Sequence, residues 1–308
     1  MEIELKLLLT DVDHKALADD LKSLAKVRAE HTQFLTNQYF DTPHLALRAK
    51  QMGLRIRQKG EFREQTLKTA GQSQLGLHSR PEYNREVHGP LPDLSAFPSA
   101  LFGDELDGLQ RQLAEQFATD FERHAIELVL GDGTELEVAL DSGLIKAKGR
   151  TVAIDELELE LIRGDIVQAL KLAQSLGQRH CLRLGQASKA ARGYRLAGLQ
   201  PEPQLVTLPP EALEQGLVAW QTNEGVLLSA AEEFEIQARD ALVTQFSGLS
   251  QLLMSSHPTE AIRLASMGQA LMDAKSPQNR LSQLLAKPSY GQIQLTLLAL
   301  VMNAQTGV

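Results

Sequence analysis

Two stretches of the chain place a charged side chain at every second position. The first, MEIELK, opens the sequence, and the second, ELELEL, covers residues 156–161. In an extended strand, successive side chains point to opposite faces, so each run puts its charges on one face and its aliphatic residues on the other. The most common explanation for one such run is a half-buried strand with a solvated polar face. A short charged helix would be a second explanation. The charged residues are Glu2, Glu4, Lys6, Glu156, Glu158 and Glu160.

Four further runs extend this pattern. Three glutamates at alternate positions of one strand lie about 7 Å apart and repel each other unless cations lie among them. The other runs supply such cations as well as more acids. They are GLRIRQK (53–59) with Arg55 and Arg57, EQTLK (64–68) with Lys68, RPEYNRE (80–86) with Arg80 and Glu82, and TELEVALDSG (134–143) with Glu137 and Asp141.

Helices could cover the apolar faces and leave the charged faces inside a barrel. Helical periodicity predicts helices over 12–27, 104–117 and 165–177. An ordinary small barrel fills its interior with aliphatic side chains. An interior lined by both carboxylates and guanidinium groups instead suits a highly charged ligand. Arginine and lysine would bind a polyanion, and carboxylates would bind hard divalent cations, so the residues predict a polyphosphate with Mg²⁺ or Mn²⁺.

The order of strands and helices predicts an α+β chain with an all-helical end. A tract with four prolines, QPEPQLVTLPP (200–210), is typical of a linker. Beyond it the periodicity is helical from 211 to about 304. We therefore expect a β-rich domain over 1–200, a linker over 201–210 and a helical domain over 211–308. Strands are expected over 2–9, 33–40, 53–59, 62–69, 80–88, 121–130, 134–141 and 151–162, with turns at KGEF (59–62) and GDGT (131–134).

Composition excludes several classes of protein. The chain has 308 residues, a net charge of −8 and one cysteine, Cys181. The acidic balance argues against broad nucleic-acid binding, and one cysteine allows no internal disulfide, which fits a reducing compartment. The charged N-terminus does not resemble a signal peptide, and the longest apolar run, IQLTLLALVM (293–302), is too short to span a bilayer. We expect a cytoplasmic protein with no membrane or nucleic-acid partner.

At this point the sequence resembles a known family. EIELK at residues 2–6 is similar to the ExExK signature of the CYTH superfamily, the triphosphate tunnel metalloenzymes. Further segments that resemble the family follow in the same order over about the first 200 residues. They are NQYFDTP (37–43), MGLRIR (52–57), TLKTAG (66–71), GLHSRPEYN (76–84), ALDSGLIKA (139–147), ELELEL (156–161) and SKAARGY (188–194). The resemblance is closest to the bacterial CYTH–CHAD inorganic triphosphatases.

The resemblance implies a closed antiparallel tunnel of eight strands with flanking helices, which hydrolyses a terminal phosphate of a triphosphate at a site for two metal ions, Mg²⁺ or Mn²⁺. The metal ligands that it implies are Glu2, Glu4, Asp141, Glu158 and Glu160. The catalytic residues that it implies are Lys6, Arg55, Arg57, Lys68, Glu82, Arg123 and Lys189. All of these except Glu82 also form the expected phosphate-binding set, to which Arg80 and Lys146 are added.

Several functional alternatives stay open on the sequence. Aromatic residues make up only 5% of the chain, which favours bare tripolyphosphate over an organic triphosphate. Thiamine triphosphatase and class IV adenylyl cyclase activities are the alternatives within the family. A non-catalytic polyphosphate receptor, or an acidic-sheet interaction protein with its charged faces outside, would be alternatives of another class.

The helical end resembles a truncated or degenerate CHAD domain, because it follows a similar linker. From residue 211 it holds five basic and nine acidic residues, so its net charge is 5 − 9 = −4. A negative net charge does not favour binding of a polyanion.

Overall fold

The computed structural model describes residues 2–306, which divide into two compact units. The first, which we call the tunnel unit, comprises residues 2–6, 25–166 and 187–201. The second, the helical unit, comprises residues 7–24, 167–186 and 202–306. The helical unit therefore takes in two earlier segments of the chain besides the C-terminal helices that the sequence set apart.

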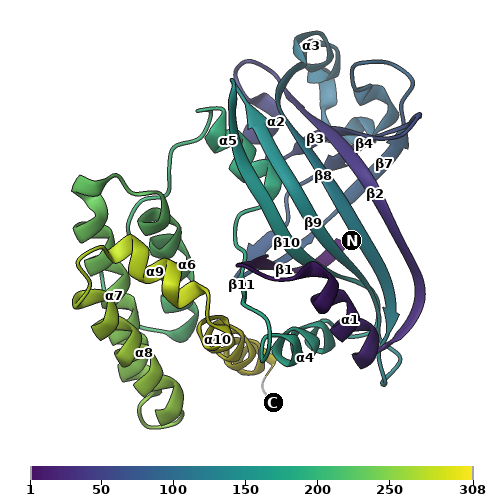
Figure 1. Cartoon of the computed structure of the whole chain (residues 1–308). Coiled ribbons are helices and arrows are strands. Elements are labelled where there is room, and N and C mark those ends of the chain that lie inside the picture. Colours follow the sequence, from purple (N-terminus) through teal and green to yellow (C-terminus); the bar gives the residue numbers. More distant parts are fainter. Residues whose placement is uncertain (1, 307–308) are drawn as a thin grey trace. The chain divides into compact units, whose positions relative to one another are not determined.

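The described strands form one antiparallel sheet (Figure 1). Its main path runs in the order β5-β6-β1-β10-β9-β8-β2-β3-β4-β7, and β11 pairs with β1. The strands are β1 (Glu2–Leu9), β2 (Lys26–Asp41), β3 (Gly53–Lys59), β4 (Phe62–Lys68), β5 (Gln72–Gln74), β6 (Leu77–Arg80), β7 (Glu82–Glu86), β8 (Ala114–Val129), β9 (Glu135–Ala147), β10 (Arg150–Arg163) and β11 (Leu182–Leu184).

Pro81 connects β6, the second strand of this path, to β7, its last strand. On one side of it, β6 pairs with β1, with Arg80 opposite Glu2. On the other side, β7 pairs with β4, with Glu82 opposite Lys68. A proline has no N–H to donate to a ladder, which explains the break between the two short strands. When β6 and β7 are counted as one interrupted strand, eight strands form the ring, as the sequence predicted.

The described helices are of ordinary length, and none is long and apolar enough to cross a membrane. The predicted helix over 104–117 is shorter in the structure, because Leu113 is extended and β8 begins at the next residue. The helices are α1 (His14–Leu24), α2 (Ala46–Ala49), α3 (Leu106–Gln112), α4 (Ile166–Leu176), α5 (Lys189–Leu196), α6 (Leu213–Ser229), α7 (Glu235–Leu253), α8 (Pro258–Met272), α9 (Pro277–Leu285) and α10 (Pro288–Thr306).

The tunnel unit has one apolar cluster outside the ring and one inside. The outer cluster packs Leu54, Ile56 and Leu67 of β3 and β4 against residues of α2, α3 and the turns before α3. The inner cluster joins the inward residues Phe117 and Phe121 to the helix α5. Burying these apolar surfaces fixes the outward faces of β3 and β4 and closes part of the interior with α5.

Helix α5 lies so close to β8 that only glycine fits at one position. A Cβ atom at Gly193 would overlap the ring of Phe117. On the other side of this ring, Tyr39 stacks with a centroid distance of 4.5 Å, and Tyr194 of α5 meets it edge-on at 5.0 Å. The aromatic contacts therefore hold α5 against the inner face of the sheet.

The helical unit contains a buried polar network and an ordered linker. Glu224 of α6 is 2% exposed and accepts a hydrogen bond from the Tyr290 hydroxyl at 2.7 Å, while Arg183 of β11 forms an ion pair with it. The expected linker is coil, but its backbone is fastened to helices: Asn223 donates to and accepts from Val206. The linker therefore packs against α6 through these backbone hydrogen bonds.

We expect Gly193→Ala to destabilise the fold, because the new methyl group must displace either the Phe117 ring or α5. Overpacking of this kind typically costs about 1–3 kcal/mol. Urea unfolding of the purified protein measures this change. Gly108→Ala in α3 is the matched control: a Cβ there meets nothing within 4 Å, and alanine favours helix by up to about 1 kcal/mol. Equal stabilities of the two variants would contradict the close packing of α5.

Candidate active site

The tunnel unit encloses a cavity of about 170 Å³ whose wall is almost entirely charged. Every strand of the ring contributes at least one residue to it. The lining comprises Glu2, Glu4, Lys6, Tyr39, Gly53, Arg55, Arg57, Lys68, Arg80, Glu82, Arg123, Glu137, Glu158, Glu160, Ser188, Lys189 and Ala190. Alternation along the strands places these side chains inward, so the interior of the ring is charged, as the sequence predicted.

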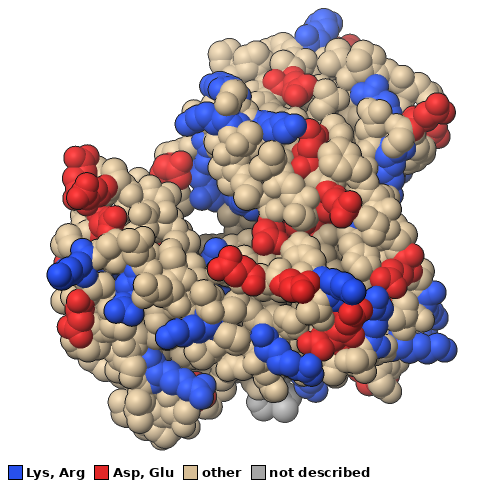
Figure 2. Space-filling view, viewed as in Figure 1, with Lys and Arg blue, Asp and Glu red and all other residues tan. Residues whose placement is uncertain are grey.

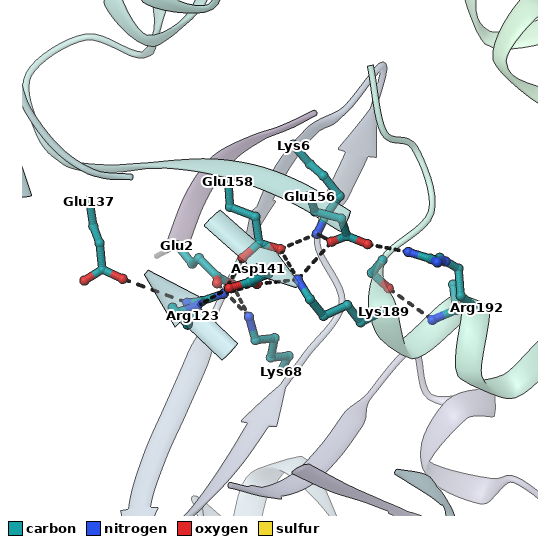
Figure 3. A network of polar contacts seen from close by, with 12 residues as sticks. Glu2, Lys6, Lys68, Arg123, Glu137, Asp141, Glu156, Glu158, Lys189 and Arg192 are labelled. Carbon is teal, nitrogen blue, oxygen red and sulfur yellow. Dashed lines mark hydrogen bonds and ion pairs between the residues drawn. The ribbon is translucent and has the colours of Figure 1, made fainter. Parts of the chain in front are cut away.

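The ammonium group of Lys189 lies at the centre of an ion-pair network (Figure 3). Its Nζ is 2.7 Å from Asp141 Oδ2 and 2.9 Å from both Glu156 Oε2 and Glu158 Oε1. Burial disfavours the charged form of this lysine, but the three carboxylates outweigh burial and raise its pKa. Lys189 opens α5, whose N-cap Ser188 accepts a hydrogen bond from Ala191 N. The helix thus delivers a cation to the acidic face of β9 and β10.

Two further cations neutralise the same carboxylates. Arg123 donates from Nε and Nη2 to the two oxygens of Asp141, each at 2.7 Å, and from Nη2 to Glu158 Oε2 at 2.7 Å. Lys6 Nζ pairs with Glu158 and lies 3.1 Å from Glu156 Oε2. Although burial raises the pKa of Glu158, Lys189, Lys6 and Arg123 lower it well below its usual range. Glu156 and Glu158 are therefore ionised, and all three acids are engaged in ion pairs.

A second group of ion pairs lies on β1, β4 and β7. Lys68 Nζ is 2.6 Å from Glu2 Oε1 and 2.8 Å from Glu82 Oε2. Although burial raises the pKa of Glu82, Lys68 and Arg55 lower it to about 2. Arg80 Nε is 3.6 Å from Glu2 Oε2, too far for a hydrogen bond. Glu2 differs from Glu82, because burial and the nearby carboxylates raise the pKa of Glu2 in spite of Lys68.

Two arginines of β3 form a basic pole that lacks acidic partners. Within residues 2–306, no carboxylate oxygen lies within 4.0 Å of the guanidinium nitrogens of Arg55 or Arg57. Arg57 Nε donates to Asn37 Oδ1 at 2.8 Å, and Arg55 bonds the side chain of Tyr39. Burial, Arg55 and Arg123 together lower the pKa of Arg57 to about 9, so it stays cationic at neutral pH. The two guanidinium groups are available to an anion.

Four carboxylates, those of Glu2, Glu4, Glu137 and Glu160, form an acidic pole in the same cavity. Glu4 is 5% exposed, and neither Glu4 nor Glu160 has an ion pair or hydrogen bond with any residue that the structure describes. Glu137 lies across from Glu160 in the β9–β10 ladder and reaches Arg123 only at 3.9 Å. Burial, together with Glu2, Glu137 and Glu4, raises the pKa of Glu160 to about 7. The acids at this pole repel one another, and a cation among them would relieve the repulsion.

The structure gathers nearly all of the sequence-predicted site residues around this cavity. Asp141 lies behind the wall, fully buried against Arg123 and Lys189. Lys146 does not reach the cavity: its Nζ pairs with Asp120 Oδ2 at 2.6 Å, and its side chain is 48% exposed. The reason is its place in β9, where odd-numbered residues such as Glu137 and Asp141 point inward and Lys146 points outward.

Sequence reasoning left four contributors out of the predicted site. Glu137 and Glu156 were on the predicted charged faces, and alternation alone could have added them. Tyr39 lines the cavity as well, but aromatic residues on a strand usually indicate core. Asn37 carries no charge, so no pattern of charges could find it.

The acidic pole fits a divalent cation by its donor chemistry. Mg²⁺ and Mn²⁺ prefer carboxylate oxygens, and the raised pKa values of Glu2 and Glu160 show that negative charge is crowded there. In the described part of the chain, no group of three or more acidic, histidine or cysteine side chains is arranged to hold a metal as it stands. Binding a metal would therefore require the side chains of Glu2, Glu4 and Glu160 to converge.

Comparison with known proteins decides the family. The model of the CYTH domain matches residues 1–194, which is more than half of the chain. The chain belongs to the CYTH family. The ion-pair network and both poles of the cavity lie within the matched CYTH domain.

Among curated proteins, an inorganic triphosphatase of Haemophilus influenzae is 35% identical over 199 residues, which cover 65% of this chain and 56% of the relative. The chain thus spans little more than half the length of that relative. Among solved structures, a Hippeastrum protein described as a candidate adenylyl cyclase with a dominant triphosphatase activity is 20% identical, with a TM-score of 0.43 over 63% of this chain and 96% of its own. The inorganic triphosphatase NE1496 is also 20% identical, with a TM-score of 0.24 over 55% of this chain and 79% of its own.

We expect Glu160→Gln to stabilise the metal-free protein at alkaline pH. The pKa of Glu160 is about 7 in the folded chain against an ordinary 4.5, so folding favours its protonated form and stability falls as pH rises between these values. At pH 8 the variant should be more stable by roughly 3 kcal/mol, and below pH 4.5 the difference should vanish.

Urea unfolding in EDTA at a series of pH values measures this difference. Glu122→Gln, on the exposed outer side of β8, is the control and should follow the wild type. A Glu160→Gln variant that is no more stable than the wild type at pH 8 would show that the acidic pole is not crowded.

Proposed function

We propose that this CYTH domain hydrolyses inorganic triphosphate to diphosphate and phosphate with a divalent cation. The observation that carries the proposal is the separation of the two poles: among the residues that the structure describes, Arg55 and Arg57 have no acidic partner, and Glu4 and Glu160 have no basic one. A triphosphate that carries Mg²⁺ or Mn²⁺ offers a complementary partner to each pole. The curated relative that is named an inorganic triphosphatase supports the same substrate.

The roles of the residues follow from their contacts. Arg55 and Arg57 would bind phosphate oxygens and stabilise the charge that develops on them during transfer. Lys6, Lys68, Arg80, Arg123 and Lys189 complete the proposed phosphate-binding set. Arg123 and Lys189 are held in place by buried acids, so they would need little reorganisation during the reaction.

The metal would be held by carboxylates of the acidic pole. Glu2, Glu4 and Glu160 are the proposed ligands, and Glu137 is a further candidate because it lines the same side of the cavity. Asp141 and Glu158, which the resemblance also implied, are already neutralised by Arg123 and Lys189 and would act mainly by orienting those cations. A bound Mg²⁺ or Mn²⁺ would supply charge neutralisation and a water molecule of lowered pKa.

The size of the site and its few aromatic residues favour a bare triphosphate. Tyr39 is the one aromatic side chain on the cavity wall in the described chain, and its ring is already stacked on Phe117. Phe40 and Tyr83 pack in the outer cluster, away from the interior. The described wall of the cavity therefore offers no further aromatic ring to stack on a thiazole or an adenine, as a thiamine triphosphatase or a cyclase would need.

The remaining alternatives concern binding without catalysis. A non-catalytic polyphosphate receptor would use the same arginines. A measurement of turnover therefore decides between an enzyme and a receptor. An interaction protein with outward charged faces fits less well, because Glu4 and Lys6 are buried. Acidic and basic side chains are interspersed on the face shown in Figure 2. We keep the relation of α6–α10 to a degenerate CHAD domain as a hypothesis, based on their helical content and net charge of −4.

We expect phosphate release from tripolyphosphate in the presence of Mg²⁺ or Mn²⁺, with ATP and thiamine triphosphate turned over at least about tenfold more slowly. Arg57→Ala and Glu4→Ala should each lower kcat/KM by about 100-fold or more, because each removes a charged contact from one pole. Lys59→Ala is the control, since this residue is exposed at the end of β3. Tight binding of tripolyphosphate without turnover would instead make the protein a receptor.

A further inference from the structure

A neutral side chain of β2 contacts the basic pole. Asn37 lies at the start of the segment NQYFD and is 1% exposed. Its Oδ1 accepts a hydrogen bond from Arg57 Nε at 2.8 Å, and its Nδ2 donates to Thr119 Oγ1 at 2.9 Å. Thr119 has no exposed surface. Both ends of the amide are therefore engaged, one by the candidate substrate-binding residue and one by the core.

The strand register aligns these three residues. In the ladders, Asn37 of β2 lies directly opposite Arg57 of β3 on one side and Thr119 of β8 on the other. Two residues further along, Tyr39 lies opposite Arg55. Strand β2 thus places a neutral hydrogen-bonding side chain beside each arginine of the basic pole.

The neutrality of Asn37 matters because of what the other cations contact. Lys6, Lys68, Arg123 and Lys189 all form ion pairs with carboxylates. Arg57 is oriented by an amide oxygen, which fixes the direction of the guanidinium group without cancelling its charge. An aspartate at position 37 would instead form a charge-assisted bond with Arg57 and compete with any phosphate that approached it.

We propose that Asn37 is a positioning residue that directs Arg57 toward a phosphate group while leaving its charge uncompensated, and that Thr119 holds the amide in place. The inference rests on the proposed function, because an uncompensated, half-buried cation is useful only to an anionic ligand. It also gives a reason for an uncharged side chain in contact with Arg57.

Asn37→Asp tests the inference with little change of shape. The Thr119 hydroxyl can donate to a carboxylate as well as accept from an amide, so the local contact can be kept. We expect KM for tripolyphosphate, and its Kd by titration calorimetry in EDTA, to rise by about tenfold or more, since a tenfold change corresponds to about 1.4 kcal/mol. Asn37→Ala, which removes orientation but not charge, should raise both values by only about threefold.

Two controls separate positioning from general damage. Gln38→Glu makes the same chemical change one residue along β2, but there the side chain points outward to Glu115, so KM and Kd should stay at wild-type values. In an Arg57→Ala background, Asn37→Asp should have no further effect on Kd. Thr119→Val leaves the charges unchanged and should resemble Asn37→Ala, which keeps the inference testable if Asn37→Asp does not fold.

Specific outcomes would overturn the inference. A Kd for Asn37→Asp no higher than that for Asn37→Ala would reduce Asn37 to a packing residue. An undiminished effect of Asn37→Asp without Arg57, or wild-type binding by Thr119→Val, would also contradict it. If the wild type binds tripolyphosphate without hydrolysing it, the proposed function fails but the Kd values still test Asn37. If the wild type does neither, both proposals fall.

Discussion

Like charges cannot share the interior of a small β-ring unless opposite charges are buried with them. The acidic strand β10 would place Glu156 and Glu158 side by side in a low-dielectric space, where their repulsion is strong. The ammonium group of Lys189 lies among these two acids and Asp141 and contacts all three. This contact depends on the position of α5, which packs closely on the sheet where Gly193 meets Phe117. Arg123 is oriented toward the same group of acids.

The acids around Lys189 are neutralised by ion pairs. The two ends of the cavity are not, and one end is basic while the other is acidic. Arg55 and Arg57 lie on one side without acidic partners, and Glu4 and Glu160 lie on the other without basic partners among the residues that the structure describes. A site that was neutralised throughout would hold its own ion pairs too tightly to exchange them for a ligand. The structure instead engages Asp141, Glu156 and Glu158 in ion pairs and leaves the side chains at the poles available, which is a form of preorganisation.

The charged faces of the strands could be predicted from the sequence, but the ion pairs between their side chains could not. Alternation is a local property, so Arg55, Arg57, Glu158 and Glu160 could be placed on inward faces from short stretches of sequence. The contact between Lys189 and Asp141 depends on a helix that returns to the ring 48 positions later along the chain, and no local pattern encodes it.

Strand boundaries and neutral residues limited the prediction in other places. Strand β9 extends to Ala147, beyond the expected end at residue 141. Because side chains alternate along this extension, Lys146 points outward. Asn37 was missed because a search for charges passes over an amide. The buried contacts of Glu224 were missed for the opposite reason, since a lone acid in a helical pattern indicates a solvated face.

The most direct test of this account is a double-mutant cycle between Lys189 and Glu158, measured as the free energy of unfolding in urea. Lys189→Met alone should destabilise the protein by roughly 3–5 kcal/mol, because it leaves three buried acids without their shared cation. Adding Glu158→Gln should restore part of that loss, giving a coupling energy of about 1–3 kcal/mol. Strictly additive effects of the two substitutions would show that the buried network does not hold the tunnel together.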